Sequence, residues 1–143
     1  MNGKRIAAIV VVVWCLLTVG CAWAGGFANG TLTFNSLVWL KNADCFGQQN
    51  FDQATNSCAG LKTGSCGLSD GSTVGQWRLP NKDELIEASK YSLSFSNDNS
   101  SYYWSSTTSS VPNNAWSVYF DDGRIFVGNR DYVNYVLCVH KQQ

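Results

Sequence analysis

The residues that could act as catalytic acids, bases or nucleophiles are few and scattered. His140 is the only histidine, and no nucleophile stands near it in the sequence. The acidic pair Asp121-Asp122 has the chemistry of a general acid and a general base. Because Gly123 follows directly, the pair is better explained as the tight turn of a hairpin. We therefore expect no catalytic residues and no enzymatic activity.

Metal ligands are equally sparse. Asn97-Asp98-Asn99 and Asp121-Asp122 carry oxygen ligands of the kind that calcium prefers, but the sequence does not show that the two groups converge. A zinc site is disfavoured because there is no C-x-x-C pair and the one histidine lies near the end of the chain. We expect no bound metal and no cofactor.

Cysteine is the most informative residue type. The chain has six cysteines, and two of them, Cys15 and Cys21, lie in the N-terminal segment. The four others are Cys45, Cys58, Cys66 and Cys138. An even number in an exported domain predicts two disulfide bonds, and four cysteines allow three connectivities.

A region rich in Ser, Asn and Thr, residues 92–114, has the composition of a recognition loop. Rigid aromatic rings beside hydroxyl and amide groups suit recognition, and flat rings suit the apolar face of a sugar. The candidate ligand-binding residues here are Asn99, Tyr102, Tyr103 and Trp104. The alternative is that Tyr103 and Trp104 belong to the core, since aromatic side chains dominate burial in small domains.

Two arginines lie on or beside the last predicted hairpin. Arg124 and Arg130 could donate bidentate hydrogen bonds to sulfate or carboxylate groups of an acidic glycan. The alternative is that they are ordinary surface charges near Asp121, Asp122 and Asp131.

Residues 1–24 have the organisation of a secretory signal peptide. Lys4 and Arg5 form a basic region, residues 6–19 an apolar region, and Ala22-Trp23-Ala24 a small-residue cleavage site. The domain is then 25–143, beginning at Gly25. The apolar region is shorter than the ~20 residues of a spanning helix.

A second interpretation of this segment is lipidation. Thr18-Val19-Gly20-Cys21 resembles a bacterial lipoprotein signal, in which Cys21 carries the lipid and becomes the first mature residue. We expect contact with a membrane only in that case. Both routes place the domain outside the cytoplasm, secreted, periplasmic or at the cell surface.

The charge balance excludes one class of partner. Of ten basic and ten acidic residues, two basic ones, Lys4 and Arg5, lie in the signal segment, which leaves a nearly neutral domain. That balance argues against binding to nucleic acid.

Two helices and several strands must position these residues. We predict a helix at about 51–60, capped by Asn50, with Phe51, Ala54, Cys58 and Leu61 on one face, and another at about 82–90. The second follows a short extended segment around Trp77 and has Asn81 and Glu84 as a capping box. Strands are expected at 31–34, 37–40 and 102–106, in a hairpin at 116–127, and in a final central strand at 132–139.

Four blocks of sequence resemble one family. "VWLKNADCFG", "GQWRLPNKDEL", "YYWSSTT" and "AWSVYFDDGRIFVGNRDYVNYVLCV" resemble the Lcl C-terminal domain family, named for a bacterial collagen-like adhesin. The resemblance implies an α+β, C-type-lectin-like fold, in which two helices flank a small twisted antiparallel sheet with long irregular loops. It also implies that a bridge joins the first helix to the last strand, Cys58 to Cys138, so that Cys45 pairs with Cys66.

The expected function is an exported, non-enzymatic binding or adhesion domain. We expect it to recognise a glycan, a surface polymer or a surface protein through its loops rich in Ser, Asn, Tyr and Trp. The alternative is a lipid-anchored or periplasmic structural component of the envelope that binds another protein. The related formylglycine-generating fold uses reactive cysteines, but here all four are assigned to bridges, so we expect no oxidase activity.

Overall fold

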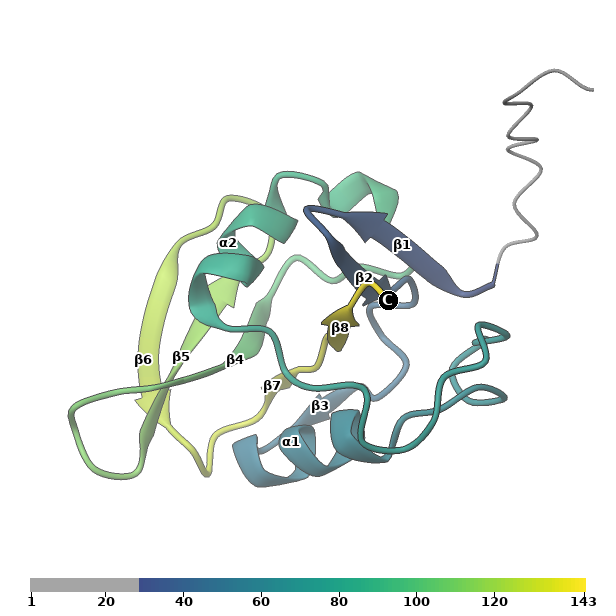
Figure 1. Cartoon of the computed structure of the whole chain (residues 1–143). Coiled ribbons are helices and arrows are strands. Elements are labelled where there is room, and N and C mark those ends of the chain that lie inside the picture. The colour runs from purple at the N-terminus through teal and green to yellow at the C-terminus, as the bar shows by residue number, and fades with distance from the viewer. Residues whose placement is uncertain (1–28) are drawn as a thin grey trace, which may run out of the picture.

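The structure is a computed structural model that describes residues 29–143. The predicted signal peptide and Cys21 lie outside these residues. Within them the chain forms an α+β domain with two α-helices, two sheets and two disulfide bonds (Figure 1). No helix in this range is sufficiently long and apolar to cross a membrane.

The strands divide between two sheets. The three-stranded sheet has the order β1-β2-β8 and contains β1 (Thr31–Phe34), β2 (Leu37–Leu40) and β8 (Val139–Lys141). The five-stranded sheet has the order β3-β7-β4-β5-β6 and contains β3 (Gln48–Gln49), β7 (Asn134–Tyr135), β4 (Tyr102–Thr108), β5 (Asn114–Tyr119) and β6 (Ile125–Asn129). The α-helices are α1 (Phe51–Gly60) and α2 (Lys82–Ser89), and a 3₁₀ helix spans Ser92–Ser94.

Both α-helices begin at the asparagine caps that the sequence predicts. The Asn81 side chain accepts a hydrogen bond from the Glu84 N–H at 2.8 Å, and the Glu84 carboxylate accepts one from the Asn81 N–H at 2.7 Å. Asn50 and Gln53 form the same capping box at α1. Such caps satisfy N–H groups that have no partner inside the helix, and each cap contributes about 1 kcal/mol.

The helices lie on opposite faces of the five-stranded sheet. Trp104 of β4 meets Phe51 of α1 edge to face, with ring centroids 5.7 Å apart. The adjacent Tyr103 belongs to a different cluster, together with Leu85 and Ala88 of α2. Because successive side chains of a strand point to opposite faces, one helix covers each face, as the resemblance implied.

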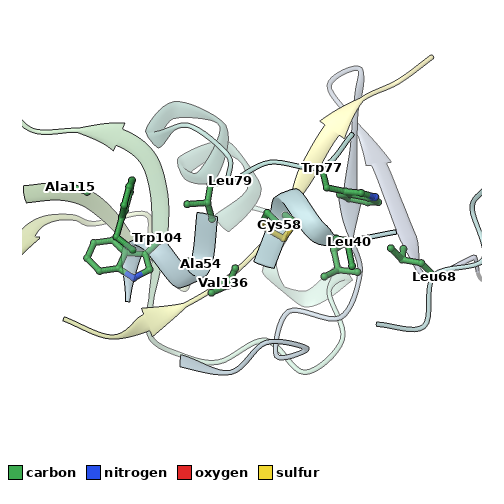
Figure 2. Close-up of a cluster of buried hydrophobic side chains, with 12 residues drawn as sticks. Leu40, Ala54, Cys58, Leu68, Trp77, Leu79, Trp104, Ala115 and Val136 are labelled. Atoms are coloured by element: carbon green, nitrogen blue, oxygen red, sulfur yellow. A yellow bond between two sulfur atoms is a disulfide. The ribbon is translucent and has the colours of Figure 1, made fainter. Parts of the chain in front are cut away.

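Two clusters of buried side chains make up the core. Figure 2 shows the first, in which Cys58 lies between Trp104 at one end and Trp77 at the other. The second cluster lies under α2 and contains Trp39, Tyr103 and Phe120.

The final strand differs from the prediction of one continuous strand at 132–139. Tyr135 pairs with Tyr103 in the five-stranded sheet, whereas Val139 pairs with Trp39 in the other sheet. Between these points Val136 and Cys138 face the first cluster, and Leu137 faces the second. This segment therefore supplies side chains to both clusters as it passes from one sheet to the other.

The sheets also differ from the single antiparallel sheet that the resemblance implied. There are two sheets, and β4 pairs with β7 in parallel. β7 lies between β3 and β4, so the prediction of a central position holds for this part of the last segment.

The implied disulfide pairing is confirmed. Cys58 of α1 is bonded to Cys138, with Cα atoms 5.5 Å apart, and Cys45 is bonded to Cys66 at 5.6 Å. The first bridge is buried in the core, while the second ties two surface loops together.

Candidate functional site

The pairing of β4, β5 and β6 places aromatic side chains on one face of the five-stranded sheet. Tyr102 is the direct partner of Tyr119, and their ring centroids lie 5.2 Å apart. On the next strand Phe126 stands opposite Ser117, two residues before Tyr119 and therefore on the same face. The Phe126 ring lies 5.7 Å from that of Tyr102.

A glycine allows a fourth ring to join this group. A Cβ atom at Gly128 would lie 2.9 Å from the Phe126 ring and 3.3 Å from the Tyr132 ring. The two rings therefore occupy the space above Gly128 that a side chain would fill. Gly128 itself is buried beneath them.

We call Tyr102, Tyr119, Phe126 and Tyr132 the aromatic surface. Phe126 is 47 % exposed and Tyr132 is 60 % exposed, and the two other rings are half-buried. Helix α1 covers the same face of the sheet farther along, at Trp104 and Ala115. The aromatic surface is thus the part of this face that α1 leaves open.

Arg124 lies beside the aromatic surface. Its guanidinium carbon is 4.8 Å from the centre of the Tyr119 ring, and its Nε donates to the Asp122 carboxylate at 2.6 Å. The Arg124 backbone N–H also donates to Asp122 at 3.0 Å. These contacts hold a planar cation against a planar ring, at the turn where the sequence predicts a hairpin.

Two of the candidate ligand-binding residues do not reach the surface. Tyr103 and Trp104 are both 0 % exposed, so the alternative assignment to the core describes them correctly. The Trp104 indole N–H donates to the backbone carbonyl of Gln49 at 2.8 Å, which joins β4 to β3. Neither side chain offers a face to a ligand.

The Tyr103 hydroxyl positions the candidate residue Asn99. The Asn99 backbone N–H donates to the Tyr103 hydroxyl at 3.0 Å, and its side-chain amide donates to the carbonyl of Asn97. Burial raises the pKa of Tyr103 to about 12. The phenol therefore stays neutral and fixes the loop that leads into Tyr102.

Arg130 lies apart from Arg124, because the two residues flank β6 at opposite ends. A strand rises about 3.3 Å per residue, which separates them by roughly 20 Å. Arg130 stacks on the Phe51 ring at 4.3 Å and pairs with Asp52 of α1. The structure thus assigns Arg130 to the contact between α1 and β6 and does not bring the two arginines together.

His140 is more enclosed than a terminal histidine in solvent would be. Its side chain is 13 % exposed and its ring lies edge-on to Trp77 at 4.4 Å. Nδ1 is 2.7 Å from the carbonyl of Lys141, while Nε2 is 3.9 Å from the Asp70 carboxylate. Residues 29–143 contain no group of three or more His, Cys, Asp or Glu side chains with the spacing of a metal site.

Sequence reasoning missed Tyr119, Phe126 and Tyr132. The signal for Tyr119 was present, since it alternates with Val118 and Phe120 on a predicted strand. Phe126 stands between Ile125 and Val127, so alternation alone could not decide which face would be covered.

Comparison with known proteins gives one family. The model of the Lcl C-terminal domain matches residues 28–140, which includes both disulfide bonds and the whole aromatic surface. No curated protein matches the chain.

Proposed function

Because the chain belongs to the Lcl C-terminal domain family, we propose that it is an exported, non-enzymatic binding or adhesion domain that recognises a glycan or a surface polymer. The family is associated with an adhesin. The aromatic surface is the observation that carries the proposal.

The chemistry of this surface suits a ligand with flat apolar faces and polar edges. Three rings on neighbouring strands, with the Tyr132 ring beside them, present both ring faces and tyrosine hydroxyls, and such amphipathic rings lose little conformational entropy on binding. Arg124, stacked on Tyr119, adds a donor for oxygen atoms at the edge of a ligand. Of the predicted residues, Tyr102 and Arg124 remain as direct contacts, with Asn99 supporting the adjacent loop.

Several features support binding rather than catalysis. All four cysteines in residues 29–143 are bridged, so no thiolate is free to act as a nucleophile. The Asp121-Asp122 pair precedes Gly123, whose φ of 75° is that of a tight turn, and Asp122 is engaged by Arg124.

The disulfide bonds support a location outside the cytoplasm, where such bonds persist. We propose that residues 1–24 direct export and that the mature domain begins at Gly25. We further propose that the fold is a C-type-lectin-like variant, because α1 is bridged to the C-terminal segment and the first and last strands share a sheet.

The test compares binding of the purified, oxidised protein and its variants to a glycan array and to immobilised matrix polysaccharides. Phe126→Ser combined with Tyr132→Ser should weaken binding by about tenfold or more. Tyr91→Ser is the matched control, because Tyr91 is 46 % exposed and its ring packs on Phe34 of the other sheet, with centroids 5.0 Å apart. Binding that the double variant retains in full, or no binding to any ligand by the wild type, would overturn the proposal.

The second candidate, a component of the envelope that binds another protein, is favoured by the same composition. Tyrosine, phenylalanine and arginine are enriched at protein interfaces. Mass spectrometry of the native N-terminus separates the two, because a lipidated Cys21 supports the anchored component and a free Gly25 supports secretion.

A further inference from the structure

The charges around the aromatic surface bear on the kind of glycan that it could take. Residues 99–135 carry all four rings of this surface. The charged side chains in this stretch are Asp121, Asp122, Arg124, Arg130 and Asp131. Which sign of ligand charge they favour depends on which of them are already paired within the protein.

Both arginines are paired. The Arg124 Nε donates to the Asp122 carboxylate at 2.6 Å, and Arg130 pairs with Asp52 of α1. A sulfate or carboxylate group gains most from a guanidinium whose charge is free, and here a carboxylate balances each guanidinium. Because a guanidinium has five N–H groups, Arg124 still keeps donors for an uncharged oxygen atom.

The two remaining charges are both negative. Asp121 and Asp131 are exposed, and neither forms an ion pair with any residue in the described range 29–143. Asp121 stands two residues after Tyr119, so their Cα atoms are at most about 8 Å apart, and Asp131 directly precedes Tyr132. These separations lie within the screening length of about 8 Å at physiological salt. Both carboxylates therefore act on a ligand at the aromatic surface.

We propose that the aromatic surface selects uncharged, hydroxyl-rich glycans and excludes sulfated and carboxylated ones. This inference rests on the proposed function of glycan binding, and it reverses the expectation that Arg124 and Arg130 meet acidic groups. The apolar face of a neutral sugar packs on the rings, and its hydroxyl groups donate to the Asp121 and Asp131 carboxylates. An ionised sulfate group has no hydrogen to donate and is repelled by both carboxylates.

The tilt of the rings restricts the physical form of the ligand. The Tyr102 ring makes an angle of 67° with the Tyr119 ring and of 50° with the Phe126 ring. The face of a crystalline polysaccharide is flat, and stacking on it requires rings that lie in one plane. Tilted rings instead contact a single sugar chain from different sides. The ligand is therefore a single chain or a chain end.

The test measures binding of the oxidised protein to a glycan array, on which each neutral glycan is compared with its sulfated and sialylated forms. At low salt the wild type should bind the neutral form about fivefold more strongly, because two carboxylates about 8 Å away each disfavour an anionic ligand. Raising the salt concentration should reduce this preference without weakening binding of the neutral form.

Matched variants test whether the two carboxylates cause the preference. Asp121→Asn combined with Asp131→Asn keeps an oxygen acceptor at each position but removes the charge, so the preference should fall below about twofold. Asp83→Asn combined with Glu87→Gln is the control. It changes the net charge by the same amount on α2, which covers the opposite face of the sheet, and should leave the preference unchanged.

A further variant tests whether the pairing of Arg124 matters. Asp122→Asn removes the carboxylate that balances Arg124, so binding of the sulfated forms should rise by about twofold or more. No gain with the sulfated forms would contradict the role given to this ion pair.

Two results would overturn the inference and leave the proposed function intact. The first is stronger binding of the acidic form than of the neutral form by the wild type. The second is a neutral preference that persists unchanged when Asp121 and Asp131 are both replaced by asparagine. Sedimentation of the protein with microcrystalline cellulose or chitin would contradict the restriction to single chains. Binding to no glycan at all would overturn the proposed function itself, and this inference with it.

Discussion

The guanidinium group of Arg78 donates two hydrogen bonds to the Glu84 carboxylate, each 2.8 Å long. The Glu84 carboxylate also accepts the Asn81 N–H at 2.7 Å. The Glu84 side chain thus joins the segment around Trp77 to the first turn of α2. The hydrogen bond from Arg78 is the largest cause that holds the pKa of Glu84 below its usual value.

Replacing Glu84 with glutamine should lower the free energy of unfolding at neutral pH by roughly 1 kcal/mol. The loss is modest because the Arg78 side chain is 42 % exposed, and water screens the pair. Because folding lowers the pKa of Glu84, its ionised carboxylate stabilises the folded protein fully above about pH 5. This stabilisation is lost as the pH falls through the pKa of Glu84 in the folded state. Urea unfolding across this range should therefore show the wild type and Glu84→Gln converging in acid. A constant difference would contradict the assignment.

Tyr103 should make the protein sensitive to alkali. Burial raises its pKa to about 12, whereas an unfolded tyrosine ionises near pH 10. The neutral Tyr103 therefore stabilises the folded protein fully at pH values below its pKa in the unfolded state. This stabilisation declines as the pH rises toward its pKa in the folded state. The free energy of unfolding should fall by up to roughly 1.4 kcal/mol per pH unit above pH 10.

The variant Tyr103→Phe isolates this effect. It should remove the contribution of Tyr103 to the alkaline fall, while destabilising the protein at pH 7 by about 1 kcal/mol because the Asn99 N–H loses its acceptor. An unchanged alkaline profile in this variant would disprove the role of Tyr103.

Gly30 is required by a close approach between the start of β1 and the loop after α1. A Cβ atom at Gly30 would lie 2.4 Å from the carbonyl oxygen of Gly67, and φ is 79°. Gly30→Ala should destabilise the protein by about 2 kcal/mol or more. Gly71→Ala is the control, since its φ is 77° but nothing lies within 4 Å. Equal thermal unfolding of the two variants would show that only φ matters.

Gly128 should affect binding more than stability. In Gly128→Ala the new methyl group would displace the Phe126 and Tyr132 rings, whose exposed ends can move at the surface. We expect a loss of stability of about 1 kcal/mol or less, with a clear loss of the proposed glycan binding. Loss of folding, or unchanged binding to a ligand that the wild type binds, would contradict this prediction.

The two disulfide bonds should differ in their reaction with reductant. Cys58 and Cys138 are both 0 % exposed, whereas Cys45 and Cys66 are partly exposed. Because thiol exchange requires access to sulfur, mild reduction should open Cys45–Cys66 first. Differential alkylation followed by peptide mapping measures the order, and simultaneous opening would contradict it.

Removing the two disulfide bonds should lower the stability of the protein by different amounts. On the chain-entropy model the long closure contributes about 4.5 kcal/mol and the short one about 3.4 kcal/mol. Cys58→Ala with Cys138→Ala should therefore destabilise the protein more than Cys45→Ala with Cys66→Ala. Thermal unfolding of the two paired variants checks this order.

Local features of the fold were predictable from sequence, and long-range ones were not. The caps at Asn50 and Asn81 depend on neighbours within one helical turn, so the local sequence predicts them. The segment Val136–Val139 is apolar at every position, and its pattern does not tell which residues face which cluster. The bridge Cys58–Cys138 came from family resemblance, since spacing left three connectivities open.

The exposed aromatic residues were predicted less well because aromatic character does not indicate exposure. Tyr102 and Tyr103 are adjacent and alike, yet the first lies on the aromatic surface and the second in the core. Alternation along β4 separates them, but only the position of α1 and α2 decides which face stays open.

The covalent link from Cys58 to Cys138 has a mechanical consequence. A pulling force applied to the two ends of the chain would pass through this link, so that residues 59–137 could not be extended while it is intact. The aromatic surface lies wholly inside that closed loop. The rings of the aromatic surface would therefore stay shielded from tension, even after β1 had been detached.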